Sequence, residues 1–198
     1  DAGPLLQELL SAPDDASFAM ALTVSRELDA SSVTHVLISS LPTLPPPRQT
    51  QVIRMLGDRG DPAARDALVQ FAGSSDVAMR AAALLALGRT GDVSTISILL
   101  AAASDSEAEI VAAARQAMVT LPGDDIDVAV GAAFAAAEGS LRRFLIDVIG
   151  QRRIKSAAAE LAPLANDPDE PTRLAALRAL GQVIDAPQLP VLTARLLP

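Results

Sequence analysis

His35 is the only histidine in this chain of 198 residues, and the chain contains no cysteine. Without cysteine there is no disulfide, no thiolate nucleophile and no cysteine-bound metal, and a single histidine excludes a multi-histidine metal site. A triad that pairs His35 with Ser31 or Ser32 would also need a strained nucleophile turn and an oxyanion hole, and neither has a sequence signature here. We therefore predict a structural histidine and no catalytic residue.

Acidic residues are the other candidates for chemistry. They gather before predicted helices, as Asp14 with Asp15, Asp124 with Asp125 and Asp127, and Asp167 with Asp169. A carboxylate at the start of a helix accepts hydrogen bonds from free N–H groups and complements the helix dipole. We predict this capping role, with weak binding of a divalent cation as the alternative. No sequence signal predicts a cofactor or a specific metal site.

The charge balance limits the class of partner. The net charge is −8, and only Lys155 among the 16 basic residues is a lysine. Phosphate-binding surfaces depend on an excess of basic residues, so we expect neither nucleic acid nor an anionic membrane as the partner. No apolar run reaches the roughly 18 residues of a membrane-spanning helix.

One stretch of 14 residues is locally basic, with Arg142, Arg143, Arg152, Arg153 and Lys155. We place Arg152 and Arg153 in a hairpin loop, where a role in the core is not expected. A solvated loop that balances nearby acids is the favoured interpretation. If the chain binds a partner directly, we expect Arg152, Arg153 and Lys155 to contact an acidic segment of a protein or peptide.

An internal repeat positions all of these residues. An apolar residue precedes glycine at Gly57, Gly88, Gly150 and Gly181, at spacings of 31, 62 and 31 residues, with the missing middle member placed near Leu121–Pro122. Apolar residues one, four and five positions before each glycine share a helix face, so each repeat opens with an amphipathic first helix. We interpret the glycines as turn residues. The predicted buried column consists of Leu84, Leu87, Ile146, Ile149, Leu177 and Leu180.

A second helix follows in each repeat. Asp61, Asp92 and Asp185 lie four residues after a glycine and predict its N-cap, and Pro62 suits its first position. The pattern contains no strand and predicts one domain over 1–198, with the repeats clearest from about 45 to 198. The predicted helices are 3–11, 14–28, 31–41, 47–57, 62–72, 76–89, 92–103, 106–121, 125–137, 139–150, 154–165, 169–183 and 187–197.

The segments SSDVAMRAAALLALGRTGD from Ser74 and NDPDEPTRLAALRALGQV from Asn166 resemble short bacterial HEAT-like repeats of the phycobilisome-lyase type. The resemblance implies an all-α fold, a right-handed α–α superhelix of about six helical hairpins. It implies that Arg80, Arg142 and Arg173, which share one column, tie neighbouring repeats together; a row of arginines that binds anions is the alternative. It also implies that the second helices line a concave surface. The candidate binding residues on those helices are Arg65, Gln70, Ser94, Ser97, Lys155, Glu160, Gln188 and Arg195.

These features favour a non-catalytic scaffold for protein–protein interactions, because a helical solenoid presents an extended surface and needs no catalytic group. Two alternatives remain: a spacer domain of a larger exported enzyme or electron-transfer protein, and a lyase-like enzyme. The resemblance also favours an exported or periplasmic bacterial origin. Leucines open and close the sequence, so we expect association through uncapped ends; they are Leu5, Leu6, Leu9, Leu10, Leu192, Leu196 and Leu197.

Overall fold

The computed structural model describes residues 3–28 and 31–184, and these residues form helices and no strand. The first helices of the repeats are α2 (Asp15–Glu27), α4 (Pro46–Arg59), α6 (Val77–Thr90), α8 (Ala108–Thr120), α10 (Gly139–Arg152) and α12 (Glu170–Val183). The second helices are α1 (Gly3–Ser11), α3 (Ser31–Ser40), α5 (Arg65–Phe71), α7 (Ile96–Ala102), α9 (Asp124–Ala136) and α11 (Ala158–Leu161). Short 3₁₀ turns accompany them: η1 (Leu41–Thr43), η2 (Pro62–Ala64), η3 (Val93–Thr95), η4 (Lys155–Ala157) and η5 (Ala162–Asn166). The predicted all-α class is confirmed, and the predicted helix 187–197 lies outside the described residues.

The helix starts show that the repeat keeps one exact period. The N-cap residues of the first helices are Asp14, Pro45, Asp76, Glu107, Glu138 and Asp169, each 31 residues after the last. Position 119, which is 31 residues after Gly88 and 31 before Gly150, is therefore the glycine-equivalent position of α8, and it holds valine. The predicted middle member near Leu121–Pro122 is wrong by two to three residues. No glycine marks α8, so the periodicity of the apolar residues alone did not fix its register.

The glycines before the ends of the first helices lie inside helices, not in turns as predicted. A methyl group on Gly57 would lie 2.7 Å from Cα of Ala86, and one on Gly88 would lie 2.6 Å from Cα of Ala117. Gly150 meets Cα of Ala179 in the same way, at 3.0 Å. Glycine is required here because the backbone of the next first helix approaches too closely for a side chain. The turn role belongs to Gly60, which ends α4 in the left-handed conformation.

The apolar column forms the core with one exception. Leu84, Leu87, Ile146 and Ile149 are fully buried, and Leu180 is almost so, as predicted. Leu177 was also predicted to be buried but is 39% exposed. In α6 and α10 the equivalent residue is covered by the following repeat, whereas α12 is the last described helix.

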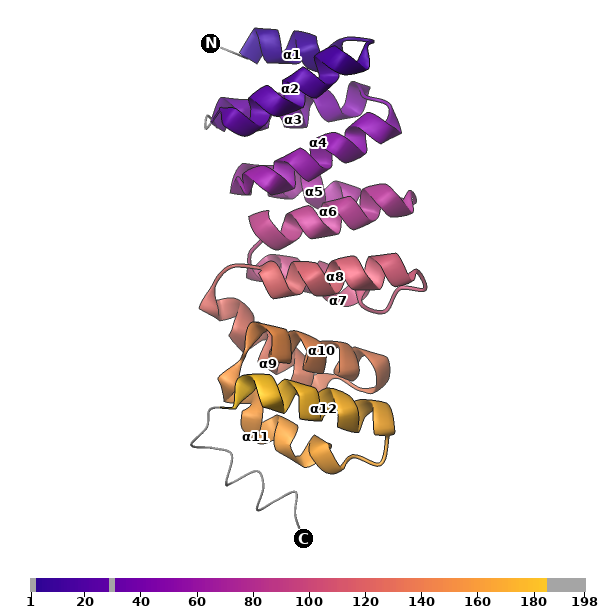
Figure 1. Ribbon diagram of the computed structural model, residues 1–198, viewed down its shortest axis with the longest axis vertical. Helices are drawn as coiled ribbons and strands as arrows, with labels where there is room; N and C mark the ends of the chain where they lie inside the picture. Colours follow the sequence, from indigo (N-terminus) through magenta and orange to yellow (C-terminus); the bar gives the residue numbers. More distant parts are fainter. Residues whose placement is uncertain (1–2, 29–30, 185–198) are drawn as a thin grey trace. The chain divides into compact units, whose positions relative to one another are not determined.

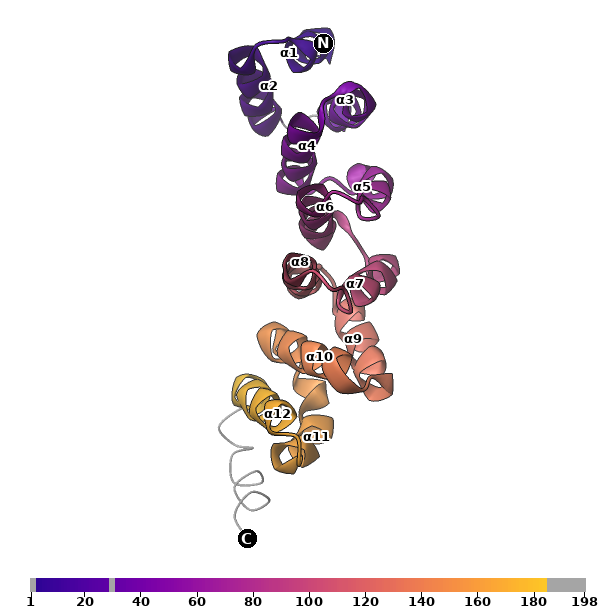
Figure 2. The ribbon, with the colours of Figure 1, turned by 90° about the vertical axis from the view of Figure 1, so that its right-hand side faces the viewer.

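The described residues belong to two compact units, Asp1–Pro122 and Gly123–Pro198. Figure 1 shows the helices of each unit stacked along the chain. In unit 1 the first helices α2, α4, α6 and α8 form one layer, and the second helices α1, α3, α5 and α7 form another (Figure 2). Whether 1–198 forms a single domain, as the sequence predicts, stays a prediction.

The N-terminal leucines are better covered than expected. Leu6 and Leu10 are buried where α1 packs against α2 and α3, whereas Leu5 is exposed. The expectation of an uncapped apolar N-terminal face is therefore wrong for Leu6 and Leu10. The three C-terminal leucines of that prediction lie outside the described residues.

Candidate functional site

The histidine and several of the acidic residues, which were the candidates for catalysis or metal binding, make hydrogen bonds to their own helices. His35 is exposed on α3, and its Nδ1 lies 2.9 Å from the carbonyl oxygen of Ser31, four residues earlier. Within residues 3–28 and 31–184, no group of three or more acidic or histidine side chains is placed to hold a metal ion. In the same residues no helix is long and apolar enough to cross a membrane.

The acidic residues cap helices, as the sequence predicts. The Asp14 carboxylate accepts from the backbone N–H of Ser17 at 2.8 Å, and that of Asp169 accepts from Thr172 N–H at 3.1 Å. These hydrogen bonds lower the pKa of both carboxyls, with the Ser17 backbone and the Thr172 hydroxyl as the respective largest causes. Asp124, Asp125 and Asp127 lie in the first turn of α9 and complement its dipole.

The residues of the predicted basic loop differ in their position and exposure. Arg152 is the last residue of α10, not a loop residue, and its side chain is 9% exposed. Its Nε donates to Oδ1 of Asp127 at 2.6 Å. The placement of Arg152 was wrong because the helix continues two residues past Gly150. Arg153 and Lys155 are exposed, as expected.

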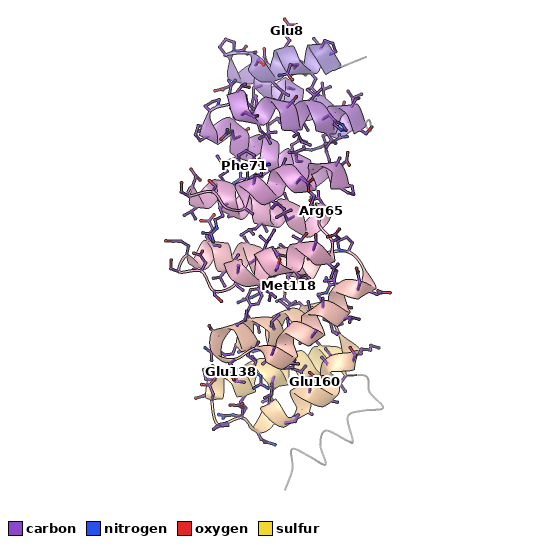
Figure 3. The ribbon with its side chains drawn as sticks, turned by 180° about the vertical axis from the view of Figure 1, so that it is seen from behind. Glu8, Arg65, Phe71, Met118, Glu138 and Glu160 are labelled. Carbon is purple, nitrogen blue, oxygen red and sulfur yellow. The ribbon has the colours of Figure 1, made fainter. Side chains whose placement is uncertain are left out.

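The candidate binding residues on the second helices also differ: one is held by contacts within the protein and others are exposed. Arg65 was expected to be free on the surface, but its NH1 donates to Asp92 at 2.5 Å and its Nε donates to the carbonyl of Thr90 at 3.2 Å. It therefore joins α5 to the loop before η3. Figure 3 looks onto the second helices, with Arg65 and Glu160 labelled. The exposed candidates are Gln70, Ser94, Ser97 and Glu160, whereas Gln188 and Arg195 lie outside the described residues.

The predicted arginine column ties neighbouring repeats at one position. Arg80 donates to Asp105, in the loop before the next first helix, at 2.5 Å. Arg173 instead donates to the carbonyl of Asp167 in its own repeat, and the guanidinium of Arg142 stacks 5.6 Å from the centre of the Phe134 ring. The column is therefore structural, but its three members use three different partners.

A hollow that the sequence analysis missed lies on the first helices of unit 1. It has a volume of 370 Å³, and α4, α6 and α8 contribute equivalent positions to it. The position three before the glycine-equivalent gives Arg54, Leu85 and Gln116 in turn, spaced by 31 residues. The position one after it gives a second row: Asp58, Arg89 and Thr120.

The floor of this hollow is made of small residues. Gly57, Ala82 and Ala86 line it between the two rows. Small residues are needed at these positions because the first helices pack closely. The same small side chains leave room for the hollow. A smaller hollow of 200 Å³ adjoins at Asp58 and is lined by Arg26, Leu28, Met55, Asp58 and Arg59. We call these two hollows together the first-helix groove.

Three first helices of unit 1, α4, α6 and α8, pack closely against one another. Backbone contacts join α4 to α6 and α6 to α8 extensively, whereas α5 and α7 approach each other little (Figure 2). The hollow lies on first helices, whereas the expectation that second helices line a concave surface stays a prediction. The residues that line the hollow could have been found in the sequence, because both rows recur at the 31-residue period.

A family model of HEAT repeats matches residues 36–119 and 126–197. The chain belongs to the HEAT-repeat family. The match covers most of the chain and confirms the resemblance that the Ser74 and Asn166 segments suggest. No curated protein matches the chain.

Similar solved structures support the same fold. A designed armadillo repeat protein in complex with the peptide (KR)4 is 11% identical, with a TM-score of 0.52, covering 93% of this chain and all of that one. An engineered protein gives 16% identity, a TM-score of 0.51 and coverage of 92% and 96%. Human deoxyhypusine hydroxylase in complex with glycerol is 17% identical, with a TM-score of 0.50; the match covers 97% of this chain and 88% of that one. At these identities the likeness concerns the fold alone.

Proposed function

We propose that this HEAT-repeat protein is a non-catalytic scaffold that binds an extended segment of a partner protein in the first-helix groove of unit 1. One observation carries the proposal. Three successive first helices place side chains of the same two repeat positions around one hollow of 370 Å³. An extended chain that crosses these helices would meet a new set of equivalent residues at each repeat.

The composition of the groove suits a protein ligand. Leu85 is 43% exposed at its centre and is available for apolar contact. Arg54 and Gln116 flank it in the same row and offer hydrogen-bond donors. An apolar centre with a polar rim is the usual anatomy of a protein–protein interface.

The groove does not offer what an enzyme of the acid–base or nucleophilic kind needs. Its titratable lining residues are arginines and Asp58, and Asp58 is paired with Arg89 at 2.8 Å. No residue of the groove forms a nucleophile–base pair. The designed armadillo repeat protein solved with a bound peptide supports peptide binding as a use of this type of fold.

Site-specific photo-crosslinking tests the proposal. A benzoylphenylalanine in place of Leu85 is expected to capture partner protein from an extract of the source cell. The control carries the same group in place of Val128, which is 75% exposed on α9 and distant from the groove in sequence. Identical products from both variants, or none from either, would contradict binding in the groove. In the second case, a spacer role becomes the better account.

A further inference from the structure

The first-helix groove is cationic, although the chain as a whole is acidic. Its charged lining residues are Arg26, Arg54, Asp58, Arg59 and Arg89, which is four positive charges against one negative. The net charge of the whole chain is −8. A concave, partly dry surface concentrates the local potential, so the groove attracts anions that the rest of the protein repels.

The four arginines are not equivalent. Arg59 donates to the carbonyl oxygens of Ser25 and Leu28 and to Thr34, so it has a structural role between α2, α3 and α4. Arg54 differs, because it is exposed and makes no hydrogen bond or ion pair in the described part of the chain. Its guanidinium is free to bind a carboxylate through two parallel N–H···O bonds.

Arg26 and Arg89 share Asp58. The distances are 3.6 Å from Arg26 and 2.8 Å from Arg89, and all three side chains are about half exposed or more. Exposed ion pairs of this kind stabilise a protein little, so a ligand carboxylate competes for them at small cost. Asp58 thus occupies a position at which an external carboxylate also fits.

An apolar residue, Leu85, lies beside the charged residues of the groove. Leu85 on α6 is flanked in its row by Arg54 on α4 and by Gln116 on α8, and Arg89 follows one helical turn after Leu85. A ligand that suits these residues carries one carboxylate for Arg54, another for Arg89 and an apolar side chain for Leu85. A phosphate backbone supplies the anions but no apolar side chain.

We propose that the groove recognises an extended acidic segment of a protein in which carboxylates alternate with apolar residues. Packed helices lie about 8–10 Å apart, and an extended chain advances about 3.3 Å per residue, so about three residues span one repeat. The lining arginines Arg26, Arg54 and Arg89 lie on the successive first helices α2, α4 and α6. The expected segment therefore carries carboxylates about three residues apart, with an apolar residue between them for Leu85. This inference rests on the proposed function and specifies its ligand.

Fluorescence anisotropy of the full chain with three labelled peptides tests it. The probes are Ser-Glu-Leu-Ser-Glu-Leu-Ser-Glu, the same peptide with lysine for glutamate, and the same peptide with glutamine. The acidic probe is expected to bind with a Kd at least about tenfold below the other two, and more weakly as salt is added. Arg54→Gln should weaken it by about tenfold, the loss of one charge-assisted contact.

Arg178→Gln is the matched control. Arg178 occupies the same repeat position on α12, is exposed, and makes no interaction in the described residues, but it does not line the groove. Its substitution should leave the Kd within about twofold. Equal losses in the two variants would place the site elsewhere.

The remaining outcomes separate the inference from the function on which it rests. If the lysine or glutamine probe binds as well as the acidic one, the charge preference is wrong and groove binding stands. If no probe binds while Leu85 still crosslinks a partner, the ligand chemistry is wrong. Stronger competition by a ten-residue oligothymidylate than by the unlabelled acidic peptide would make the groove a nucleic-acid site and overturn the inference.

Discussion

The joint between α6 and α8 and the outer side of α12 share the same repeat positions but differ in their surroundings. Gly88 faces the backbone of Ala117 so closely that a methyl group would clash, whereas a methyl group on Gly181 would meet no atom of residues 3–28 and 31–184 within 4 Å. Leu84 is fully buried, whereas its counterpart Leu177 is 39% exposed. The residue type at a repeat position therefore does not by itself determine whether the side chain is buried. Burial also requires a neighbouring repeat that covers the position.

The largest expected contrast is between two leucine truncations. Leu87→Ala should lower the free energy of unfolding by about 2–5 kcal/mol, because it removes fully buried contacts and leaves a cavity. Leu177→Ala should cost less than about 1 kcal/mol, since much of its side chain already contacts solvent. Chemical denaturation followed by circular dichroism measures both. Equal costs would mean that Leu177 is covered in solution.

Two glycine substitutions sharpen the same comparison. Gly88→Ala should destabilise the protein by about 1–3 kcal/mol, because the new Cβ would lie 2.6 Å from Cα of Ala117 and force the helices apart. Gly181→Ala should be neutral or stabilise by up to about 1 kcal/mol, because alanine favours a helix where space is open. Thermal melting of both variants decides the point. A stabilising Gly88→Ala would disprove the close-joint account.

The neighbouring arginines Arg152 and Arg153 offer a second contrast. Arg152→Ala should cost about 1–3 kcal/mol, because it leaves the carboxylate of Asp127 without its short hydrogen bond. Arg153→Gly should stabilise by about 1 kcal/mol, because Arg153 ends α10 with φ at 57°, a conformation that glycine adopts without strain. Equilibrium unfolding of both variants checks this. A destabilising Arg153→Gly would contradict the capping geometry.

The smallest effects concern acid. The pKa of the carboxyls of Asp14, Asp92, Asp105 and Asp169 is lowered from an ordinary 3.8. The largest cause is a backbone N–H hydrogen bond for Asp14 and Asp105, and a hydrogen bond from a serine or threonine hydroxyl for Asp92 and Asp169. A carboxyl with a lowered folded pKa contributes stability above its unfolded pKa and loses it as the pH falls through the folded value. The melting temperature should therefore fall as the pH drops below 3.8, and less steeply in Asp169→Asn than in the parent. Identical pH profiles would show that this cap contributes nothing.

The sequence predicted what local patterns determine. Asp61 and Asp92 cap η2 and η3, the turns that lead into α5 and α7, as expected, because a capping carboxylate and its N–H donors lie within a few residues of each other. The third predicted cap, Asp185, lies outside the described residues. Contacts across repeats were not predictable in this way. The partner of Arg152 lies 25 residues earlier, and Leu177 is an ordinary core leucine by type.

The candidate groove was missed for a related reason. One of its lining residues, Gly57, was interpreted from the sequence as a turn residue, and Arg54 was not singled out. Only the close approach of α4, α6 and α8 brings its rows together. The 31-residue spacing of Arg54, Leu85 and Gln116 was visible, but the sequence does not show that these three side chains line one hollow.

Hydrogen exchange measured with and without the peptide Ser-Glu-Leu-Ser-Glu-Leu-Ser-Glu tests the central claim most directly, because it locates the bound segment on the chain. The account predicts slower exchange in residues 54–58, 85–89 and 116–120, the turns of α4, α6 and α8 that line the groove. It predicts no change in residues 152–155, where the sequence alone had placed the partner. Protection confined to residues 152–155, with none in the three groove segments, would contradict it.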